Sequence, residues 1–424
     1  MAVHSALTDT AEGLLQSGTL RALYQPIVDL VDGRVVGYEA LARGPVGSPL
    51  EMPAALFEAA SAEGILGAFD RACRGVAIRG ALDAGLGDDD FLFLNVEPAG
   101  LESRGVLDRI GEDGLSRLSV VVELTERALA SRPSEVLAAV RWLRERGCRI
   151  ALDDVGVDPR SLGLMPFVAP DVIKLDRGLT QGAISDAEAA RVINAVRAES
   201  ERSGVVILAE GIETEQQRAR ALAMGATLGQ GWLFGRPAAL PPGRGTTGRR
   251  TGDVPRLPQR PADPDADRTP FERIADRRAV LEGDKRLLLS LSRQLEQEAF
   301  AVQGESVVIA TFQDVRFFTD KMRRRYELIA ADAALVGAIG TGVHARPGRG
   351  VRGADIEPED RLRGEWDVVV VGPHFAGAFV ARDLGDLDGP GLDAERRFEY
   401  FMTYDRDLVT DAARALLHRL IAED

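Results

Sequence analysis

The segment RIALDDVGVDPRSLGLMPFVAPDVIKLD (149–176) contains two short apolar runs, each with charged residues at its end. The first run ends at Asp153 and Asp154, and the second contains Lys174. Both runs are rich in Val, Ile and Leu, which is typical of strands buried on both faces of a sheet. The segment therefore predicts two strands whose polar ends meet at one edge.

Five further runs of this kind surround the segment. They read VVGYEAL (35–41), FLFLNV (91–96), VVVELTE (120–126), VVILAEG (205–211) and TLGQGWLF (227–234). Helical stretches such as SEVLAAVRWLRERG (134–147) and AEAARVINAVRAES (187–200) lie between the runs. Alternation of strands and helices predicts a parallel sheet. About 240 residues is the length of a (β/α)8 barrel, so we predict an α/β fold with a TIM-like (β/α)8 barrel.

Each run carries a polar residue at or near its end, and in a barrel these ends converge. The residues are Glu39, Asn95, Glu123, Asp153, Asp154, Lys174, Glu210 and Gln230. Carboxylate and amide oxygens suit Mg²⁺ or Mn²⁺ better than zinc. Adjacent aspartates allow two metals to be bridged, as in phosphodiester hydrolysis.

Lys174 and Glu210 have predicted roles in such a site. Lys174 would hold the attacking water or neutralise the charge that develops on phosphorus. Glu210 would complete the second metal or accept a proton. Two other interpretations are acidic residues that only cap the strands, and a Schiff-base lysine of the aldolase type. The carboxylates argue against the second, since they would keep the amine protonated.

Composition limits the classes of function. The chain has 424 residues, of which 45% are hydrophobic and 28% charged, and a net charge of −14. That charge argues against binding of a nucleic-acid polymer. The start of the chain lacks a signal peptide pattern and no window is apolar enough to span a membrane, so we expect a cytoplasmic protein. Three lysines among 52 basic residues make Lys174, inside an apolar run, conspicuous.

The chain divides into three regions by composition. Residues 1–238 carry the predicted barrel. Residues 239–268 are rich in Pro, Gly and Arg and are predicted to be a flexible linker. Residues 269–424 mix strand-like and helical stretches, such as SVVIATFQDV (306–315) and KRLLLSLSRQLEQEAF (285–300). They predict a smaller α+β domain, in which no catalytic constellation is evident.

The stretch YQPIVDLVDGRVVGYEALARG (24–44) resembles the opening of EAL domains, the phosphodiesterases that linearise cyclic di-GMP. The tripeptide 39–41 is the motif that names them. FLNVEP, VVELTER, ALDDVG, IKLD, AEGIET and GQGWLFGRP follow in the family's order, so the resemblance covers residues 20–238. It implies a metal-dependent hydrolysis of cyclic di-GMP to pGpG, carried out by a homodimer. No cyclase-like GGDEF segment accompanies it.

The resemblance also implies a role for each matching residue. Glu39, Asn95, Glu123 and Asp153 would bind the first metal, and Asp153, Asp154 and Glu210 the second. Lys174 would orient the hydrolytic water. Arg43 would contact a phosphate, and Gln25 and Gln230 would line the substrate groove. Glu126 would brace the loop after the sixth strand, and Glu213 would support Glu210.

The loop 155–161 departs from the family pattern. It reads VGVDPRS, where active members usually have Phe-Gly-Thr-Gly-Tyr-Ser-Ser. This change leaves open a receptor that binds cyclic di-GMP with little turnover, and an interaction protein on an inert barrel. Pro159 favours a rigid, pre-formed loop. The C-terminal region resembles the DICT sensory domain, which implies a signal or a signalling partner for residues 269–424.

Overall fold

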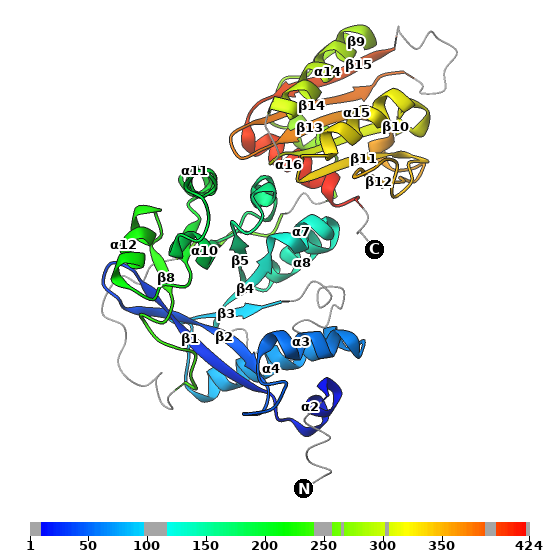
Figure 1. Ribbon diagram of the computed structural model, residues 1–424. Coiled ribbons are helices and arrows are strands. Elements are labelled where there is room, and N and C mark those ends of the chain that lie inside the picture. Colours follow the sequence, from blue (N-terminus) through cyan, green and yellow to red (C-terminus); the bar gives the residue numbers. More distant parts are fainter. Residues whose placement is uncertain are drawn as a thin grey trace.

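Strands β1 to β8 form a closed barrel in this computed structural model (Figure 1). The structure describes residues 10–96, 117–240, 257–263, 267–301, 305–385 and 396–420. The barrel strands are β1 (Arg21–Asp29), β2 (Val35–Arg43), β3 (Phe91–Asn95), β4 (Ser119–Thr125), β5 (Arg149–Val155), β6 (Val172–Leu175), β7 (Val206–Ala209) and β8 (Leu228–Gln230). All seven predicted runs are among them, which confirms the predicted barrel.

Strand β1 was not among the predicted runs, and it differs from them in direction. It pairs antiparallel with β2 and with β8, so the prediction of a wholly parallel sheet is wrong at this strand. Residues 30–34 alone connect β1 to β2, and parallel neighbours need a crossover of a dozen or more residues. The pairs from β2 to β8 are parallel, so their carboxyl ends share one mouth of the barrel.

Helices surround the barrel and apolar side chains fill it. The helices are α2 (Ala11–Ser17), α3 (Pro53–Ala62), α4 (Leu66–Asp83), α7 (Glu126–Ser131), α8 (Pro133–Glu145), α9 (Met165–Val168), α10 (Arg177–Gln181), α11 (Asp186–Ser203) and α12 (Glu215–Ala223), with the 3-10 helix η1 (Pro159–Leu164). α11 begins where the Ser185 side chain accepts a hydrogen bond from the Glu188 N–H, and it ends at the left-handed Gly204.

Within the described ranges, no helix is both long and apolar enough to cross a membrane.

A seven-stranded sheet forms the C-terminal domain, in the order β12-β11-β10-β13-β14-β15-β9. Its strands are β9 (Leu281–Asp284), β10 (Val307–Asp314), β11 (Leu335–Thr341), β12 (Arg352–Ala354), β13 (Glu365–Val371), β14 (Ala376–Asp383) and β15 (Arg397–Thr403). Its helices are α13 (Pro270–Ala275), α14 (Lys285–Ala301), η3 (Val315–Phe317), α15 (Asp320–Ala330), η4 (Arg361–Gly364) and α16 (Arg406–Leu417). The mixture of strands and helices agrees with the predicted α+β domain.

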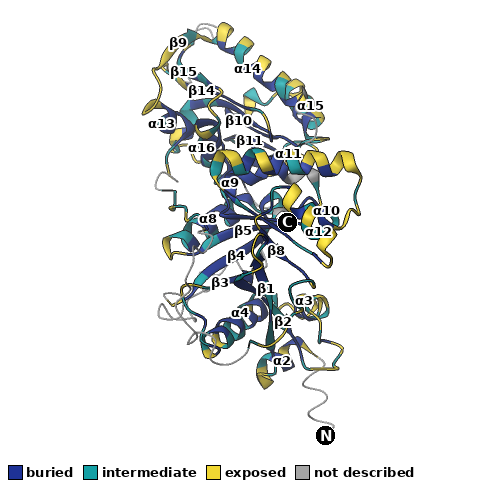
Figure 2. Cartoon of the chain, turned by 90° about the vertical axis from the view of Figure 1, so that its left-hand side faces the viewer, coloured by how far each residue is buried: buried dark blue, intermediate teal, exposed yellow. Residues whose placement is uncertain are grey.

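The two faces of this sheet are covered by different helices. α14 and α15 pack on one face, where Leu295 and Tyr326 contact the sheet core. α13 and α16 pack on the other face, which is turned toward the barrel (Figure 1). Figure 2 shows exposed residues along the outer sides of α11, α14 and α15, and buried residues along the strands between them.

Part of the predicted linker is bound to the barrel. Leu257 is 3% exposed and belongs to the apolar cluster that fills the barrel. Arg260 donates to the carbonyl oxygens of Pro170 at 3.1 Å and Ser203 at 2.7 Å. The expectation of a flexible linker therefore does not hold for residues 257–263. A Pro- and Arg-rich segment cannot form its own core, but its arginines bind carbonyls and its leucine fills a gap in the barrel. The rest of the predicted linker, residues 241–256 and 264–266, lies outside the described residues.

Leu257→Ala should destabilise the barrel, because it removes a buried side chain and leaves a cavity. The expected loss in the free energy of unfolding is about 2–5 kcal/mol. Urea denaturation measures it, with Leu328→Ala as the matched control because Leu328 is 66% exposed. Equal stability of the two variants would show that residues 257–263 do not hold the barrel.

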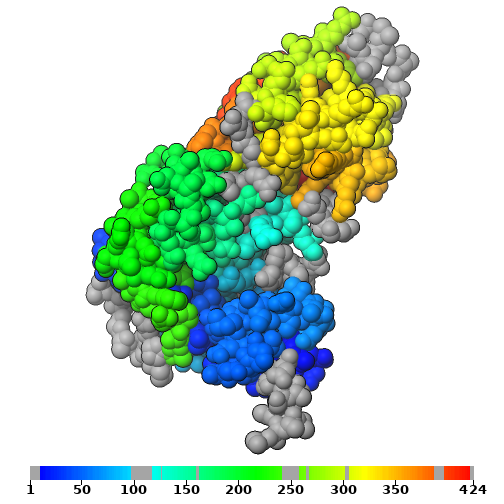
Figure 3. Space-filling model, in the orientation of Figure 1, coloured from blue at the N-terminus to red at the C-terminus, as the bar shows by residue number. Residues whose placement is uncertain are grey.

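The two domains share one hydrophobic cluster. It contains Leu164 and Phe167 beside the barrel and Val409 and Leu416 of α16. Arg414 of α16 donates to the carbonyl oxygens of Pro166 at 2.6 Å and Phe167 at 2.9 Å. Figure 3 shows the C-terminal lobe lying against the barrel. The contact reaches η1 and α9, which directly follow the strand that carries the aspartate pair.

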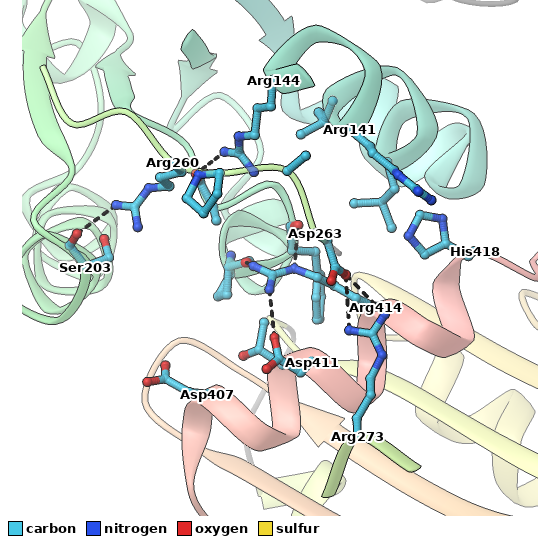
Figure 4. A pocket seen from close by; sticks show the side chains of 18 of the residues that line it. Arg141, Arg144, Ser203, Arg260, Asp263, Arg273, Asp407, Asp411, Arg414 and His418 are labelled. Atoms are coloured by element: carbon cyan, nitrogen blue, oxygen red, sulfur yellow. Dashed lines mark hydrogen bonds and ion pairs between the residues drawn. The ribbon is translucent and has the colours of Figure 1, made fainter. Parts of the chain in front are cut away.

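A cavity of about 420 Å³ lies between the domains and is lined by arginines and carboxylates (Figure 4). Arg273 pairs with Asp263 at 3.1 Å, and Arg414 with Asp411 at 2.9 Å. Burial lowers the pKa of His418 to about 4, so this imidazole is neutral at pH 7. Because these arginines are already paired with carboxylates or carbonyls, we interpret the cavity as part of the domain contact.

Candidate active site

The strand ends place four carboxylates around one buried ammonium. The Lys174 Nζ atom lies 2.6 Å from Glu123 Oε1, 2.9 Å from Asp153 Oδ1 and 2.7 Å from Glu210 Oε1. Glu39 Oε1 is 3.9 Å away. Lys174 is 1% exposed, so these charges interact with little screening by water. The five residues come from β2, β4, β5, β6 and the end of β7, as the sequence indicated.

Burial and charge shift the pKa values of these groups. Burial alone would lower the pKa of Lys174, but the surrounding carboxylates outweigh it and raise the pKa well above the usual range. Burial raises the pKa of Glu123 well above its usual value, and raises that of Glu210 to about 8. The single ammonium of Lys174 therefore does not balance the negative charge of the carboxylates around it.

The adjacent aspartates are brought together by an irregular backbone. The pairing of β5 with β6 shifts register between Leu152 and Val155. Asp154 has a left-handed φ of 58°, which is unfavourable for a non-glycine residue and is found disproportionately at functional sites. Carboxylate oxygens of Asp153, Asp154 and Glu210 lie within 4.8 Å of one another. This shift directs two successive carboxylates to the same mouth.

This donor set fits divalent cations. Glu123 is fully buried, and its carboxylate meets the Lys174 ammonium at 2.6 Å. Asp154 adds a fifth carboxylate close to those of Asp153 and Glu210, so the carboxylates of the site outnumber its one ammonium. Oxygen donors in this number are those that Mg²⁺ and Mn²⁺ prefer.

Amide side chains hold Glu39 in place at the mouth of the barrel. Asn95 Nδ2 donates to Glu39 Oε1 at 2.9 Å, and Gln230 Nε2 donates to Glu39 Oε2 at 2.5 Å. Gln230 Nε2 also lies 3.1 Å from Gln25 Oε1. The structure therefore brings Gln25, Asn95 and Gln230 to the site, in the place that the sequence predicted.

The remaining predicted residues differ in their surroundings. Arg43 is buried, and its Nη1 donates to the Ala42 carbonyl at 2.8 Å. Glu213 is exposed, and its carboxylate makes no hydrogen bond or ion pair within the parts of the chain that the structure describes. The structure thus does not show the predicted support of Glu210 by Glu213. The side chain of Glu126 lies outside the described residues.

The divergent loop after Asp154 continues into η1, which begins at Pro159. Proline fixes φ at a value that suits the first position of a helix. α9 follows directly and contacts α16 of the second domain. The loop that departs from the family pattern is therefore tied to the C-terminal domain.

A second cavity, of about 400 Å³, opens beside Glu39 and Asn95. It is also lined by Phe57, Asp70 and Arg74 from α3 and α4. Asp70 and Arg74 form a buried ion pair. Arg74 Nε and Nη2 are buried and donate no hydrogen bond within the described residues. Sequence reasoning missed these residues, since an Asp and an Arg four apart on a helix usually form a surface pair.

Two family models match the chain. One, described as the EAL domain, matches residues 8–237, more than half of the chain. The other, described as a sensory domain in diguanylate cyclases and two-component systems, matches residues 275–384. These matches confirm both resemblances that the sequence indicated.

Curated proteins match the barrel region. The cyclic di-GMP phosphodiesterase RocR of Pseudomonas aeruginosa is 34% identical over 239 residues, which are 55% of this chain and 60% of that protein. An uncharacterized protein of Mycobacterium tuberculosis is 31% identical over 242 residues, which are 54% of this chain and 77% of that protein. This chain therefore spans about three fifths of the length of the curated phosphodiesterase.

Solved structures match the same region. A calcium and cyclic di-GMP complex of BlrP1 from Klebsiella pneumoniae is 29% identical and covers 52% of this chain and 56% of that one, with a TM-score of 0.47. A cyclic di-GMP complex of the phosphodiesterase PaMucR is 25% identical and covers 57% of this chain and 98% of that one, also with a TM-score of 0.47.

Proposed function

This chain belongs to the EAL-domain family, and on that premise we propose that its barrel hydrolyses cyclic di-GMP to linear pGpG with divalent metal ions. One observation carries the proposal: four carboxylates meet one ammonium at the mouth of the barrel, and the carboxylate of Asp154 lies beside two of them. A single cyclic dinucleotide phosphate adds more negative charge, so catalysis here needs cations. Bound Mg²⁺ or Mn²⁺ would activate water and stabilise charge on the phosphate oxygens.

The donor atoms divide into two groups that share one residue. Glu39, Asn95, Glu123 and Asp153 would hold the first ion. Asp153, Asp154 and Glu210 would hold the second, and their oxygens already lie within 4.8 Å of one another. The bonds from Asn95 and Gln230 fix the orientation of Glu39. A carboxylate held in this way needs little rearrangement when it binds an ion.

Hydrolysis breaks one phosphorus–oxygen bond of the ring. A water oxygen attacks phosphorus, the bond to the sugar oxygen breaks, the water loses a proton and the sugar oxygen gains one. The Lys174 ammonium would donate a hydrogen bond to the attacking water and offset charge on the phosphate. Its raised pKa keeps it protonated at all physiological pH values, so it acts as a donor and not as a base.

The cavity beside Glu39 offers a place for one half of the substrate. Phe57 supplies an apolar wall, and Arg74 Nε and Nη2, which have no partner among the described residues, would donate hydrogen bonds to an acceptor. Buried donors that lack a partner carry a desolvation penalty, which a bound acceptor relieves. We propose that Arg74 contacts the substrate there, and that Arg43, Gln25 and Gln230 contact it at the mouth.

Incubation of the purified full chain with cyclic di-GMP tests the proposed reaction. We expect pGpG to appear in chromatography when Mg²⁺ or Mn²⁺ is present and to be absent with excess EDTA. Calcium serves as a matched control, because it binds similar oxygen donors but is larger and more flexible in its coordination. Absence of pGpG with both Mg²⁺ and Mn²⁺ would contradict the proposed activity.

The divergent loop favours a second candidate function, a receptor that binds cyclic di-GMP with little turnover. The loop 155–161 leads into η1 and α9, which the second domain contacts. Calorimetry in the presence of Ca²⁺ distinguishes the two functions, because a receptor gives saturable binding and no pGpG when Mn²⁺ replaces Ca²⁺. Light scattering of the same sample tests the predicted homodimer.

Arg74→Met should raise the KM for cyclic di-GMP by roughly 10- to 100-fold, because a buried hydrogen bond to a charged group contributes about 1.5–3 kcal/mol. We expect kcat to change much less, since Arg74 lies outside the carboxylate cluster. Asp70→Asn is the control: it removes the ion pair but keeps the Arg74 donors. If both variants raise KM equally, Arg74 has a structural role and does not contact the substrate.

A further inference from the structure

A cavity of about 290 Å³ lies inside the C-terminal domain, between the sheet and helices α14 and α15. Its walls are largely aromatic, and the rings are Phe312, Phe317, Tyr326, Trp366 and Phe398. Phe312 and Tyr326 meet edge to face at 5.5 Å, and Trp366 and Phe398 at 5.8 Å. The volume is close to the lower limit of ordinary ligand pockets, about 300 Å³.

The charged residues that line this cavity are mostly cations. They are Lys285, Arg293, Arg316 and Lys321. Lys285 Nζ lies 4.6 Å from the centre of the Phe317 ring, and the Arg316 guanidinium lies 5.0 Å from it. The chain as a whole has a net charge of −14 and three lysines, and two of these line the cavity. A positive lining in so acidic a protein favours an anion.

The one carboxylate among the lining residues is already neutralised. Glu296 is 2% exposed, forms an ion pair with Arg325, and accepts a hydrogen bond from the Tyr326 hydroxyl at 3.0 Å. Its charge is therefore compensated from within the domain. Arg316 also lies 3.9 Å from Asp314, and among the lining residues themselves cations outnumber carboxylates by four to one.

The backbone beside the cavity is strained. Gln313 has a left-handed φ of 55° and is 4% exposed. The pairing of β10 with β11 shifts register between Thr311 and Asp314, around this residue. Gln313 is held there by its own hydrogen bonds, to the Gly364 carbonyl at 3.3 Å and from Arg396 at 2.9 Å. Strain that the surroundings maintain is typical of ligand sites and uncommon in plain cores.

A packing defect is the simplest alternative explanation of the cavity. Protein interiors are close-packed, and voids much larger than a water molecule are few. A defect would have no reason to gather five aromatic rings and four cations from separate elements. The combination of an apolar interior and a charged rim matches an amphipathic ligand better.

We propose that this cavity binds a small molecule with a flat apolar body and one anionic group, such as an aromatic carboxylate. The body would contact the aromatic rings, and the anion would contact Lys285 and Lys321 at the rim. The proposal concerns the second domain and does not depend on the phosphodiesterase reaction.

Calorimetric titration of the full chain with three probes of one shape tests the proposal. The probes are 2-naphthoate, neutral 2-naphthamide and cationic 2-naphthylmethylamine. We expect 2-naphthoate to bind saturably with a Kd below about 1 mM. The amide should bind at least tenfold more weakly and the amine should show no binding. Equal affinities, or no saturation by 2-naphthoate, would overturn the proposal.

Variants locate the binding. The double change Lys285→Gln and Lys321→Gln should weaken 2-naphthoate binding at least tenfold and leave 2-naphthamide unchanged. Arg324→Gln is the matched control, because Arg324 lies on α15 but does not line the cavity. Ser292→Leu provides a second test, since Ser292 lines the cavity and a larger side chain should block both 2-naphthoate and 2-naphthamide. Unaltered binding in both the double variant and Ser292→Leu would show that the probe binds elsewhere.

Discussion

Glu123→Gln should abolish the conversion of cyclic di-GMP to pGpG and leave the barrel folded. The amide keeps the shape of the side chain but removes one of the charges that would hold the first metal. Loss of about 4 kcal/mol of transition-state stabilisation corresponds to a rate lower by roughly 1000-fold. Chromatography of pGpG measures the rate, and calorimetry with Mn²⁺ measures the affinity for the metal.

The same variant should not lose stability in the absence of metal. Burial raises the pKa of Glu123 well above its usual value. The folded state then binds more protons than the unfolded state, so this group stabilises less as pH rises above its unfolded pKa. At pH 8 without metal, the neutral Gln should therefore be at least as stable as Glu. Loss of folding with loss of activity would show that Glu123 is a structural residue.

Glu39→Ala and Asn95→Ala can be compared with Glu123→Gln, because all three residues are proposed ligands of the first metal ion. Each change removes one of the proposed metal ligands. Glu39→Ala also removes the hydrogen bonds from Asn95 and Gln230, whereas Asn95→Ala removes only its own bond to Glu39. We expect pGpG formation to fall to the background level in both. If Glu39→Ala retained most of the wild-type rate, the assignment of the site would be wrong.

The sequence predicted most of the site because a parallel barrel places strand ends together. Lys174 stood out as a lysine inside an apolar run in a chain dominated by arginine, and the structure places it among four carboxylates. The left-handed backbone of Asp154 could not be predicted, because it arises from a register shift between two strands. The place of Arg74 beside Glu39 and Asn95 could not be predicted either, because it depends on how α4 packs against the barrel.

The connection between the domains was predicted least well. The linker composition indicated flexibility, but Leu257 lies in the barrel core and Arg260 binds two carbonyls. Sequence composition cannot show that another part of the chain offers a gap or a free carbonyl. The expectation of a flexible linker therefore does not hold for its described part.

The contact suggests how the second domain would influence the barrel. α16 packs on one face of the C-terminal sheet and contacts α9, which follows the loop after Asp153 and Asp154. The ligand cavity lies on the opposite face of the same sheet. A shift of the sheet would therefore reach β5, the strand that carries Asp153 and Asp154, through α16 and α9. Coupling of this kind requires that a ligand bind two arrangements of the sheet with different affinities.

Lys174→Arg should be nearly as damaging to pGpG formation as Lys174→Ala. Lys174 is 1% exposed and lies within 3 Å of three carboxylate oxygens, so the larger, planar guanidinium cannot fit without moving them. It would keep the charge but lose the compact donor that holds one water. We expect both variants to reduce kcat by roughly 100-fold or more, as for removal of an essential electrostatic donor.

Stability without metal separates the two roles of this lysine. Lys174→Ala removes the ammonium that the four carboxylates share, so repulsion should lower the melting temperature in EDTA, and Mn²⁺ should restore it. Lys174→Arg retains a positive charge and should lose less stability in EDTA, although it fails in catalysis. Full activity of the Arg variant would show that charge alone matters at this position.

Because the carboxylates hold the amine protonated, borohydride should trap no carbonyl compound on Lys174 in the wild-type chain. A trapped adduct would instead support the aldolase alternative.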